Sequence, residues 1–280
     1  MKYTISAVIA FLFAMATATA QDTTSKAITP KKARKEVSIS NHGIYIGKSD
    51  SAAKSDDKKH KGTIGLDLGI NMIQDNTNYS DASVNSFLAG VPASKRNSSL
   101  FNQNGGLKPM NVNLSYLYTF RLLKTRGQKI NFTTGLGMQI YNFRYDNNIT
   151  YTKDPYMIVT DSVKFSKNKL GVNYLNVPLS FTFKTKLHST DDGKKSTWLV
   201  YGFGVTGGYN ISAWTKQKSD ERGKVKKHGN YEINPFNACA TAEFGIDDVV
   251  RLYGTYQLTS LYTNGLDQHP ICVGIKLIGI

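Results

Sequence analysis

The chain has few cysteines and, after its first 20 residues, no long hydrophobic run. Two cysteines, Cys239 and Cys272, are too few to form the disulfide scaffold of a 280-residue secreted protein. A membrane-spanning helix needs about 20 predominantly apolar residues, and no such run follows residue 20. Any membrane insertion by the rest of the chain must therefore use β-strands.

Residue patterns typical of catalytic and metal sites are also missing. The motif Gly202–Gly207 matches G-x-G-x-x-G, but no helical pattern follows it to receive a dinucleotide. No Ser/His/Asp set can be placed at one level along the β-strands expected in the rest of the chain. The histidines are scattered without metal-ligand spacing: His42, His60, His188, His228 and His269. We therefore expect no enzyme activity, no cofactor and no metal.

The N-terminus has the three parts of an export signal. Lys2 supplies a positive charge, Ile5–Met15 is apolar, and Ala18–Ala20 is a small-residue cleavage site. Residues 1–20 are thus predicted to be a signal peptide. The basic, mostly polar segment 21–61 is predicted to be a largely disordered periplasmic tail. It contains a short strand-like island at residues 37–46.

From residue 62 onward, apolar residues alternate with small or polar ones in segments of roughly ten residues. Eight segments are predicted as strands: Gly62–Ile73, Lys108–Leu122, Lys129–Tyr145, Gly171–Lys186, Thr197–Ala213, Asn234–Ile246, Val249–Thr259 and Pro270–Ile280. Their connections are alternately long and short. This pattern is typical of transmembrane barrels, whose long loops are extracellular and short turns periplasmic. The predicted fold is an all-β, monomeric, eight-stranded antiparallel barrel of the outer-membrane type over residues 62–280.

Because side chains alternate across a strand, the pattern also predicts two faces. The predicted lipid face is Leu66, Leu68, Ile70, Val112, Leu114, Tyr116, Tyr118, Phe120, Leu175, Val177, Leu179, Phe181, Phe183, Ile271, Val273, Ile275 and Leu277. The predicted lumen face is Asp67, Asn71, Asn113, Ser115, Arg121, Thr133, Gln139, Asn176, Ser180, Thr182, Glu243, Arg251, Gln257 and Lys276. Almost every charge within a strand falls on the lumen face.

Four lumen charges are expected to form a structural network near the periplasmic end. A turn centred on Asp247 would place Glu243 opposite Arg251, and Lys276 and Asp67 would meet at the seam of the barrel. The two cysteines also face inward. One strand separates their strands, so their Cα atoms are expected to be too far apart for a disulfide.

The formal net charge of +15 raises the question of nucleic-acid binding. Export would separate the protein from that partner, and the basic residues are spread among tails and loops. We interpret most of them as solvated charges. A sharper alternative is contact between the run Lys216–Lys227 and phosphates of outer-leaflet lipid.

A short stretch resembles a known family. Tyr174–Leu179 is similar to the Tyr-Leu-x-Ile/Val-Pro-Leu strand of the PorT-like outer-membrane β-barrel proteins of Bacteroidetes. Tyr256–Leu261 and Gly274–Leu277 are similar to that family's C-terminal strands. The resemblance implies an outer-membrane barrel; the family's namesake is an accessory of a protein-secretion system.

We therefore expect a structural or interaction role, as an accessory of a secretion or envelope complex, with outer-membrane lipid around the barrel. One alternative is a barrel that binds or transports a small apolar molecule. Another is a soluble, secreted, adhesin-like β-sandwich.

Overall fold

The computed structural model describes residues 36–40, 43–47, 60–103, 110–189, 196–247 and 250–278. The expected signal peptide and most of the expected tail lie outside these residues. Within the tail, β1 (Glu36–Ser40) and β2 (Gly43–Gly47) pair as a two-stranded sheet at the position of the strand-like island.

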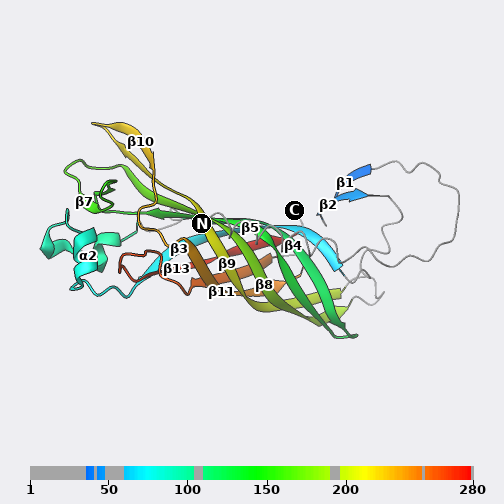
Figure 1. The fold of residues 1–280 in the computed structure, drawn as a ribbon. Coiled ribbons are helices and arrows are strands. Elements are labelled where there is room, and N and C mark those ends of the chain that lie inside the picture. The colour runs from blue at the N-terminus through cyan, green and yellow to red at the C-terminus, as the bar shows by residue number, and fades with distance from the viewer. Residues whose placement is uncertain are drawn as a thin grey trace, which may run out of the picture. The chain divides into compact units, whose positions relative to one another are not determined.

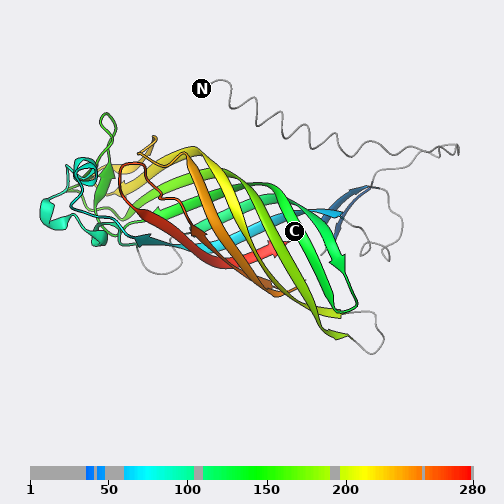
Figure 2. The same cartoon turned by 60° about the horizontal axis from the view of Figure 1, so that its bottom comes forward.

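Eight long strands form the barrel wall (Figures 1 and 2). They are β3 (His60–Asp75), β4 (Met110–Lys124), β5 (Gln128–Arg144), β8 (Lys167–Ser189), β9 (Ser196–Ser219), β11 (Phe236–Ile246), β12 (Val250–Gln257) and β13 (Gln268–Ile278). Each pairs antiparallel with the next in this order, and β13 pairs with β3 to close the ring. This confirms the predicted eight-stranded antiparallel barrel. The soluble β-sandwich alternative is wrong, because this sheet closes on itself.

At the end of the barrel where the long loops lie, β8 and β9 extend furthest beyond their predicted bounds. β8 starts at Lys167, four residues before the expected Gly171, and β9 continues from Ala213 to Ser219. The added part of β9 turns back into β10 (Gly223–His228), which pairs with it. Part of the segment expected to be a loop is therefore a β-hairpin. The alternation did not predict a strand here, because lysines take the place of the apolar residues.

The long connections emerge together at one end of the barrel, the loop end, where Figure 1 labels α2, β7 and β10. The first contains α2 (Ala82–Phe87), η2 (Ala93–Lys95) and η3 (Ser98–Phe101). The second contains β6 (Ile149–Tyr151), paired with β7 (Ile158–Thr160). The Asp81 carboxylate caps α2 by accepting a hydrogen bond from Ser83 N at 2.7 Å. In the described residues, no helix has the length and apolar character needed to cross a membrane.

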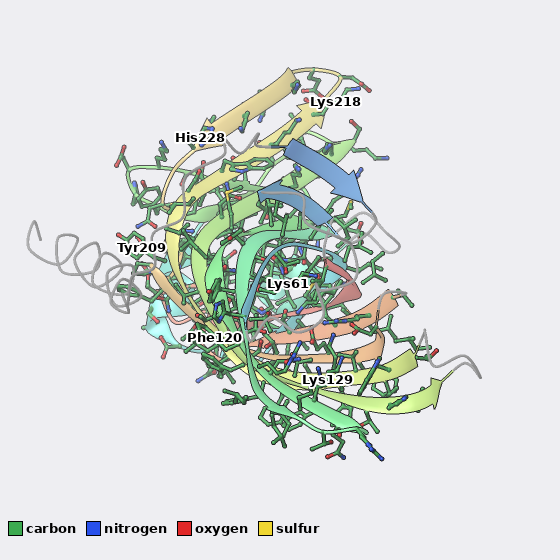
Figure 3. All side chains as sticks on the ribbon, turned by 90° about the vertical axis from the view of Figure 1, so that its right-hand side faces the viewer. Lys61, Phe120, Lys129, Tyr209, Lys218 and His228 are labelled. Carbon is green, nitrogen blue, oxygen red and sulfur yellow. The ribbon has the colours of Figure 1, made fainter. Side chains whose placement is uncertain are left out.

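The wall is apolar outside and polar inside. Leu114, Tyr116 and Val273 are at least half exposed on the outer face, whereas inward-facing Asn71 and Gln139 are 1% and 2% exposed. Near the short-turn end, aromatic rings follow one another across the outer face of β4, β5, β8 and β9: Tyr118, Phe120, Phe132, Phe181, Phe203, Phe183 and Tyr201. Figure 3 labels Phe120 and Tyr209 of this outer surface. Such girdles mark the membrane–water interfaces of transmembrane barrels.

A β-bulge in β9 changes which residues face outward. Asn173 of β8 pairs with Ser212 while Tyr174 pairs with Asn210, so Ile211 is an extra residue. Before the bulge, odd-numbered residues such as Tyr209 are exposed on the lipid face. After it, Ala213 is buried, and Trp214 and the alternate residues that follow it are outside.

Candidate functional site

Six charged side chains from five strands and one turn gather in the lumen toward the short-turn end, and we call them the lumen charge cluster. Its members are Asp67, Lys184, Glu243, Asp247, Arg251 and Lys276. Glu243 Oε2 lies 2.9 Å from Lys276 Nζ, and Glu243 Oε1 lies 3.4 Å from Arg251 Nη1. Thr182 also donates to Glu243 Oε1 at 3.1 Å. Three acidic and three basic groups make the cluster formally neutral.

The structure places the four predicted lumen charges near one another, but with a different pairing. Glu243 is directly opposite Tyr253, and Arg251 is opposite Gly245, so Glu243 and Arg251 meet diagonally. The turn centre lies one residue later than predicted. The displaced turn brings Asp247 inward, where its Oδ1 lies 2.6 Å from Arg251 Nη2.

Asp67 is opposite Lys276 in the strand register, as predicted. The lysine nevertheless bonds to Glu243, and Asp67 receives a hydrogen bond from Asn113 Nδ2 at 3.5 Å. Within the part of the chain that the structure describes, Asp67 has no ion pair.

Sequence reasoning missed two members of the cluster. Lys184 has the inward parity of Thr182, so the alternation could have placed it in the lumen, where it bonds to Asp247. Asp247 gave no such signal, because it lies in the turn itself.

Farther toward the loop end, polar side chains meet across the lumen. Asn237 Nδ2 of β11 donates to Gln139 Oε1 of β5 at 3.4 Å, although β8 and β9 separate these strands in the wall. Tyr253 Oη of β12 donates to Asn111 Oδ1 of β4 at 3.2 Å, across β13 and β3. Contacts between strands three positions apart require the side chains to cross the interior.

The cysteines belong to this crossing layer. Both thiols are free and buried, as predicted. Cys239 Sγ lies 3.9 Å from Tyr141 Oη, and Cys272 Sγ lies 3.4 Å from Tyr253 Oη. They act as small lumen-filling groups on β11 and β13, which β12 separates.

The described long connections pack on one another at the loop end to form a loop cap, which comprises residues 76–103, 145–166, 229–235 and 258–267. Its core includes Val84, Phe87, Leu88, Val91, Leu100, Phe101, Tyr145, Ile149, Tyr151, Ile158, Tyr231, Ile233, Leu261, Tyr262 and Leu266. Tyr151 Oη and Tyr262 Oη are 2.7 Å apart, and the Phe87 and Tyr262 ring centroids are 5.9 Å apart. Burial is the main reason why the pKa values of Tyr151 and Tyr262 are well above their ordinary range. The same core includes inward residues at the ends of the strands, such as Tyr141 and Tyr174.

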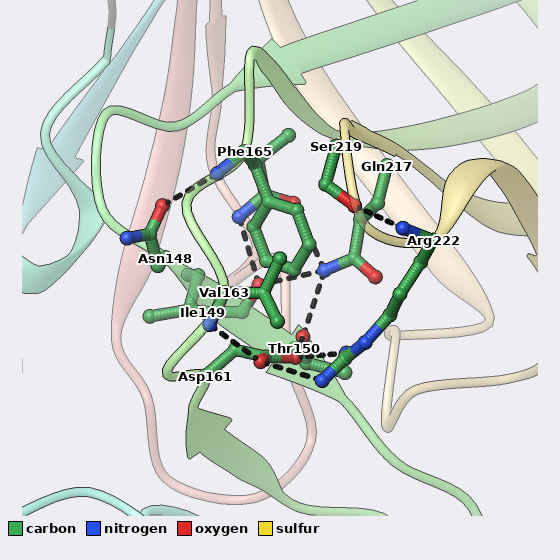
Figure 4. Close-up of polar contacts among 10 residues, drawn as sticks. Asn148, Ile149, Thr150, Asp161, Val163, Phe165, Gln217, Ser219 and Arg222 are labelled. Atoms are coloured by element: carbon green, nitrogen blue, oxygen red, sulfur yellow. Dashed lines mark hydrogen bonds and ion pairs between the residues drawn. The ribbon is translucent and has the colours of Figure 1, made fainter.

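One ion pair ties the β9–β10 hairpin to the loop cap (Figure 4). Arg222 Nη1 and Nη2 bond to the two Asp161 oxygens at 2.7 and 3.1 Å. Thr150 Oγ1 and the Val163 N–H also donate to this carboxylate, at 3.0 and 3.1 Å. Burial favours the neutral form of Asp161, but the hydrogen bonds from Arg222, Val163 and Thr150 outweigh it and lower the pKa of the carboxyl group.

The described residues contain no group of three or more His, Cys, Asp or Glu side chains that could hold a metal ion. Among the described histidines, His269 has a nearby carboxylate: its Nε2 lies 2.9 Å from Asp267 Oδ1. Its Nδ1 lies 2.9 Å from the Gln257 carbonyl oxygen, so both ring nitrogens are engaged within the protein. This pair therefore leaves no ring nitrogen to activate a nucleophile.

The closed sheet, the apolar outer face and the aromatic girdle together decide the class of the fold. The chain is a β-barrel of the outer-membrane type. No protein-family model and no curated protein matches the sequence.

Among solved structures, the barrel is similar to Ail, the attachment invasion locus protein of Yersinia pestis. The identity is 7%, the match covers 79% of this chain and 99% of Ail, and the TM-score is 0.26. A mutant of the Rh. blastica porin matches with 8% identity over 78% of this chain and 99% of the porin, at a TM-score of 0.18.

Proposed function

We propose that this protein is a non-conducting scaffold of the bacterial outer membrane, whose loop cap binds a protein of a secretion or envelope complex. The observation that carries the proposal is the folding of separate long connections around one buried core. A surface built on a packed core loses little conformational entropy on binding, so it suits protein recognition. The outer-membrane location is supported by the expected export signal, the apolar outer face and the aromatic girdle.

A channel is disfavoured by the filled lumen. An eight-stranded barrel has an interior just wide enough for side chains to fill. Here the lumen charge cluster and the Gln139–Asn237 and Asn111–Tyr253 contacts cross it at successive levels. The loop cap core then continues from the inner surface of the strands. A barrel for a small apolar molecule is also disfavoured. The inward apolar side chains near the loop end, such as Phe143 and Leu170, belong to the packed core of the loop cap, and the groups that meet below them are amides, hydroxyls, thiols and charges.

The resemblance of Tyr174–Leu179 to PorT-like barrels supports a secretion or envelope complex as the setting. In this proposal the long loops face outward, and the short turns and both termini of the barrel face the periplasm, as is usual for outer-membrane barrels. The loop cap is the binding surface, and the barrel anchors it in the membrane.

Affinity purification from native outer membranes tests the proposal, with Phe87→Ala as the deciding variant. Phe87 is 4% exposed in the loop cap core, and losing its ring is expected to cost about 3–5 kcal/mol locally. Leu122→Ala is the matched control, because Leu122 is 57% exposed and lies outside the loop cap, near the short-turn end of β4. We expect the parent and the control to retain a stable protein partner that the Phe87→Ala barrel loses at equal barrel yield.

Planar-bilayer recording tests the scaffold role independently. The parent should show no large, steady conductance. Sustained channels would contradict the proposal. It would also be contradicted if the parent and both variants recovered partners equally, or if none of the three recovered a partner.

A further inference from the structure

Among the described residues, the most strongly charged feature beyond the lumen and loop cap is a set of basic side chains on the outer face of β5, β8, β9 and β10. We call this set the basic face. It consists of Arg144, Lys167, Lys169, Lys216, Lys218, Lys224 and Lys226. Figure 3 labels Lys218 and, at the other end of β10, His228.

The strand register arranges these residues in two rows. One row runs across three strands as Lys167, Lys218 and Lys224. The next runs across four strands as Arg144, Lys169, Lys216 and Lys226. Neighbouring strands are about 4.8 Å apart, and alternate residues along a strand are about 6.6 Å apart. The cationic groups therefore share one surface patch rather than separate loops.

The described carboxylates do not neutralise this patch. Within the described residues, no ion pair joins any member of the basic face to a carboxylate. Lys169 Nζ donates to the amide oxygen of Asn142 at 2.8 Å, and Arg144 Nη2 donates to Ser166 O at 3.2 Å. Arg144 Nε is buried and has no acceptor. Like charges opposite one another destabilise a sheet, so an external anion bound to the patch would stabilise it.

The position of the patch indicates the source of that anion. On the same outer surface, Tyr209 and Ile211 of β9 and Leu175 of β8 are exposed apolar residues of the lipid face. Trp214 follows, with Lys169 Nζ and Lys226 Nζ 4.5 and 4.8 Å from its ring centroid. Trp214 lies over Gly171, where a Cβ atom would collide with the indole. Along the outer surface, the apolar face is thus followed by an interfacial tryptophan and then by a cationic patch. This order matches the change from acyl chains to headgroups across a membrane leaflet.

The five residue-to-residue steps from Ile211 to Lys216 span about 16 Å along the strand, and roughly 12 Å along a barrel axis from which the strand is tilted by about 45°. We propose that the basic face binds phosphate groups of anionic lipid in the outer leaflet and so orients the barrel and its loop cap at the membrane surface. This inference rests on the proposed outer-membrane location with the loops outside.

The experiment uses Trp214 as its reporter. The chain has two tryptophans, so Trp198→Phe leaves Trp214 alone. In that background, the full chain is titrated in detergent micelles with phosphatidic acid, or with phosphatidylcholine at equal mole fractions. The test variant combines Lys167→Gln, Lys216→Gln and Lys224→Gln, which removes one lysine from each strand but keeps the two lysines over Trp214.

The matched control removes the same charge from exposed lysines elsewhere, with Lys61→Gln, Lys95→Gln and Lys153→Gln. A basic residue near an anionic surface changes binding about fivefold, so the test variant should bind phosphatidic acid roughly 100-fold more weakly. The control should bind like the parent, and binding by the parent should weaken from 0.1 to 0.5 M salt. Phosphatidylcholine should cause no comparable change in Trp214 fluorescence.

Equal affinities of test and control variants would overturn the proposal. An equal response to inorganic phosphate would show a site for free anion, and an equal response to duplex DNA would show a general polyanion surface; each would also overturn it. Failure of the proposed scaffold role would instead appear as conductance or as a missing partner, with micelle binding unchanged.

Discussion

Replacing Glu243 with alanine should destabilise the barrel by leaving one buried ammonium group without its partner. Glu243 accepts from Lys276 at 2.9 Å, Arg251 at 3.4 Å and Thr182 at 3.1 Å. Arg251 keeps Asp247 at 2.6 Å after the substitution. Lys276 loses the only ion pair that it makes among the described residues. The lumen charge cluster then carries an excess of one positive charge.

The expected cost follows from the burial of the pair. The Glu243 and Lys276 side chains are 10% and 21% exposed. Breaking one partner of a buried ion pair typically costs about 3–5 kcal/mol. Asp67 faces Lys276 in the register and can partly compensate its positive charge, so we place the cost at about 3 kcal/mol. For a folded unit of this size, that corresponds to a decrease of roughly 6–12 °C in Tm. Lys276→Ala should cost less, because Glu243 retains Arg251 and Thr182.

Thermal unfolding of purified barrels in one detergent measures these changes, followed by β-sheet circular dichroism and by heat-dependent gel mobility. Glu221→Ala is the control, since this residue is exposed at the β9–β10 turn. The double variant Glu243→Ala/Lys276→Ala removes the unpaired charge and restores neutrality, so it should be more stable than Glu243→Ala alone. Export and membrane insertion should be unchanged.

Two outcomes would refute this reasoning. If both single variants melt like the parent, the cluster is solvated and contributes no net stability. If the double variant is as unstable as the sum of the single variants, the charges do not interact, and the assignment of Glu243 and Lys276 to one network is wrong.

Two further predictions concern the loop cap and the lumen. Because the folded pKa of Asp161 is lowered from 3.8, its contribution is present above that value and is lost as pH falls through the folded pKa. Exchange of the Val163 amide, corrected for its intrinsic rate, should therefore accelerate below about pH 4; an Asp161→Asn barrel with the same pH profile would refute this. Cys239 and Cys272, 1% and 0% exposed, should react with maleimide only after unfolding, whereas a cysteine introduced at exposed Ser80 should react at once. Rapid labelling of the native cysteines in the folded barrel would mean that the lumen is not packed.

The alternation was sufficient to predict all eight barrel strands, because a wall between lipid and a polar lumen imposes a period of two on every strand. It failed where lipid no longer covers the outer face. From Trp214 to Ser219, strand β9 has lysines outside instead of apolar residues, so its continuation was interpreted as a loop. Hydrogen bonding to β8 and β10 maintains the strand there, and no local residue preference records those partners.

In the candidate site, too, the alternation predicted one part of the arrangement and not another. The inward parity of Asp67, Glu243, Arg251 and Lys276 followed from the alternation, but their bonds depend on the turn, which lies one residue later than predicted. The loop cap was not predicted at all. Tyr151 and Tyr262 are 111 residues apart in sequence, and their contact depends on the barrel bringing their loops to one end.

The extra residue at Ile211 has a consequence for how the chain tolerates insertions and deletions. Below it, odd-numbered residues of β9 face lipid; above it, Ala213 faces inward and Trp214 faces outward. Deleting one residue here would remove the bulge, because Asn210 and Ser212 would then be consecutive opposite Tyr174 and Asn173, and Trp214 and the lysines would keep their outward faces. Inserting a second residue would instead turn the lysines toward the buried core, because a one-residue slip reverses every side chain. The bulge can therefore absorb the loss of one residue from this part of β9, whereas an added residue is better accommodated in the turn at residues 220–222.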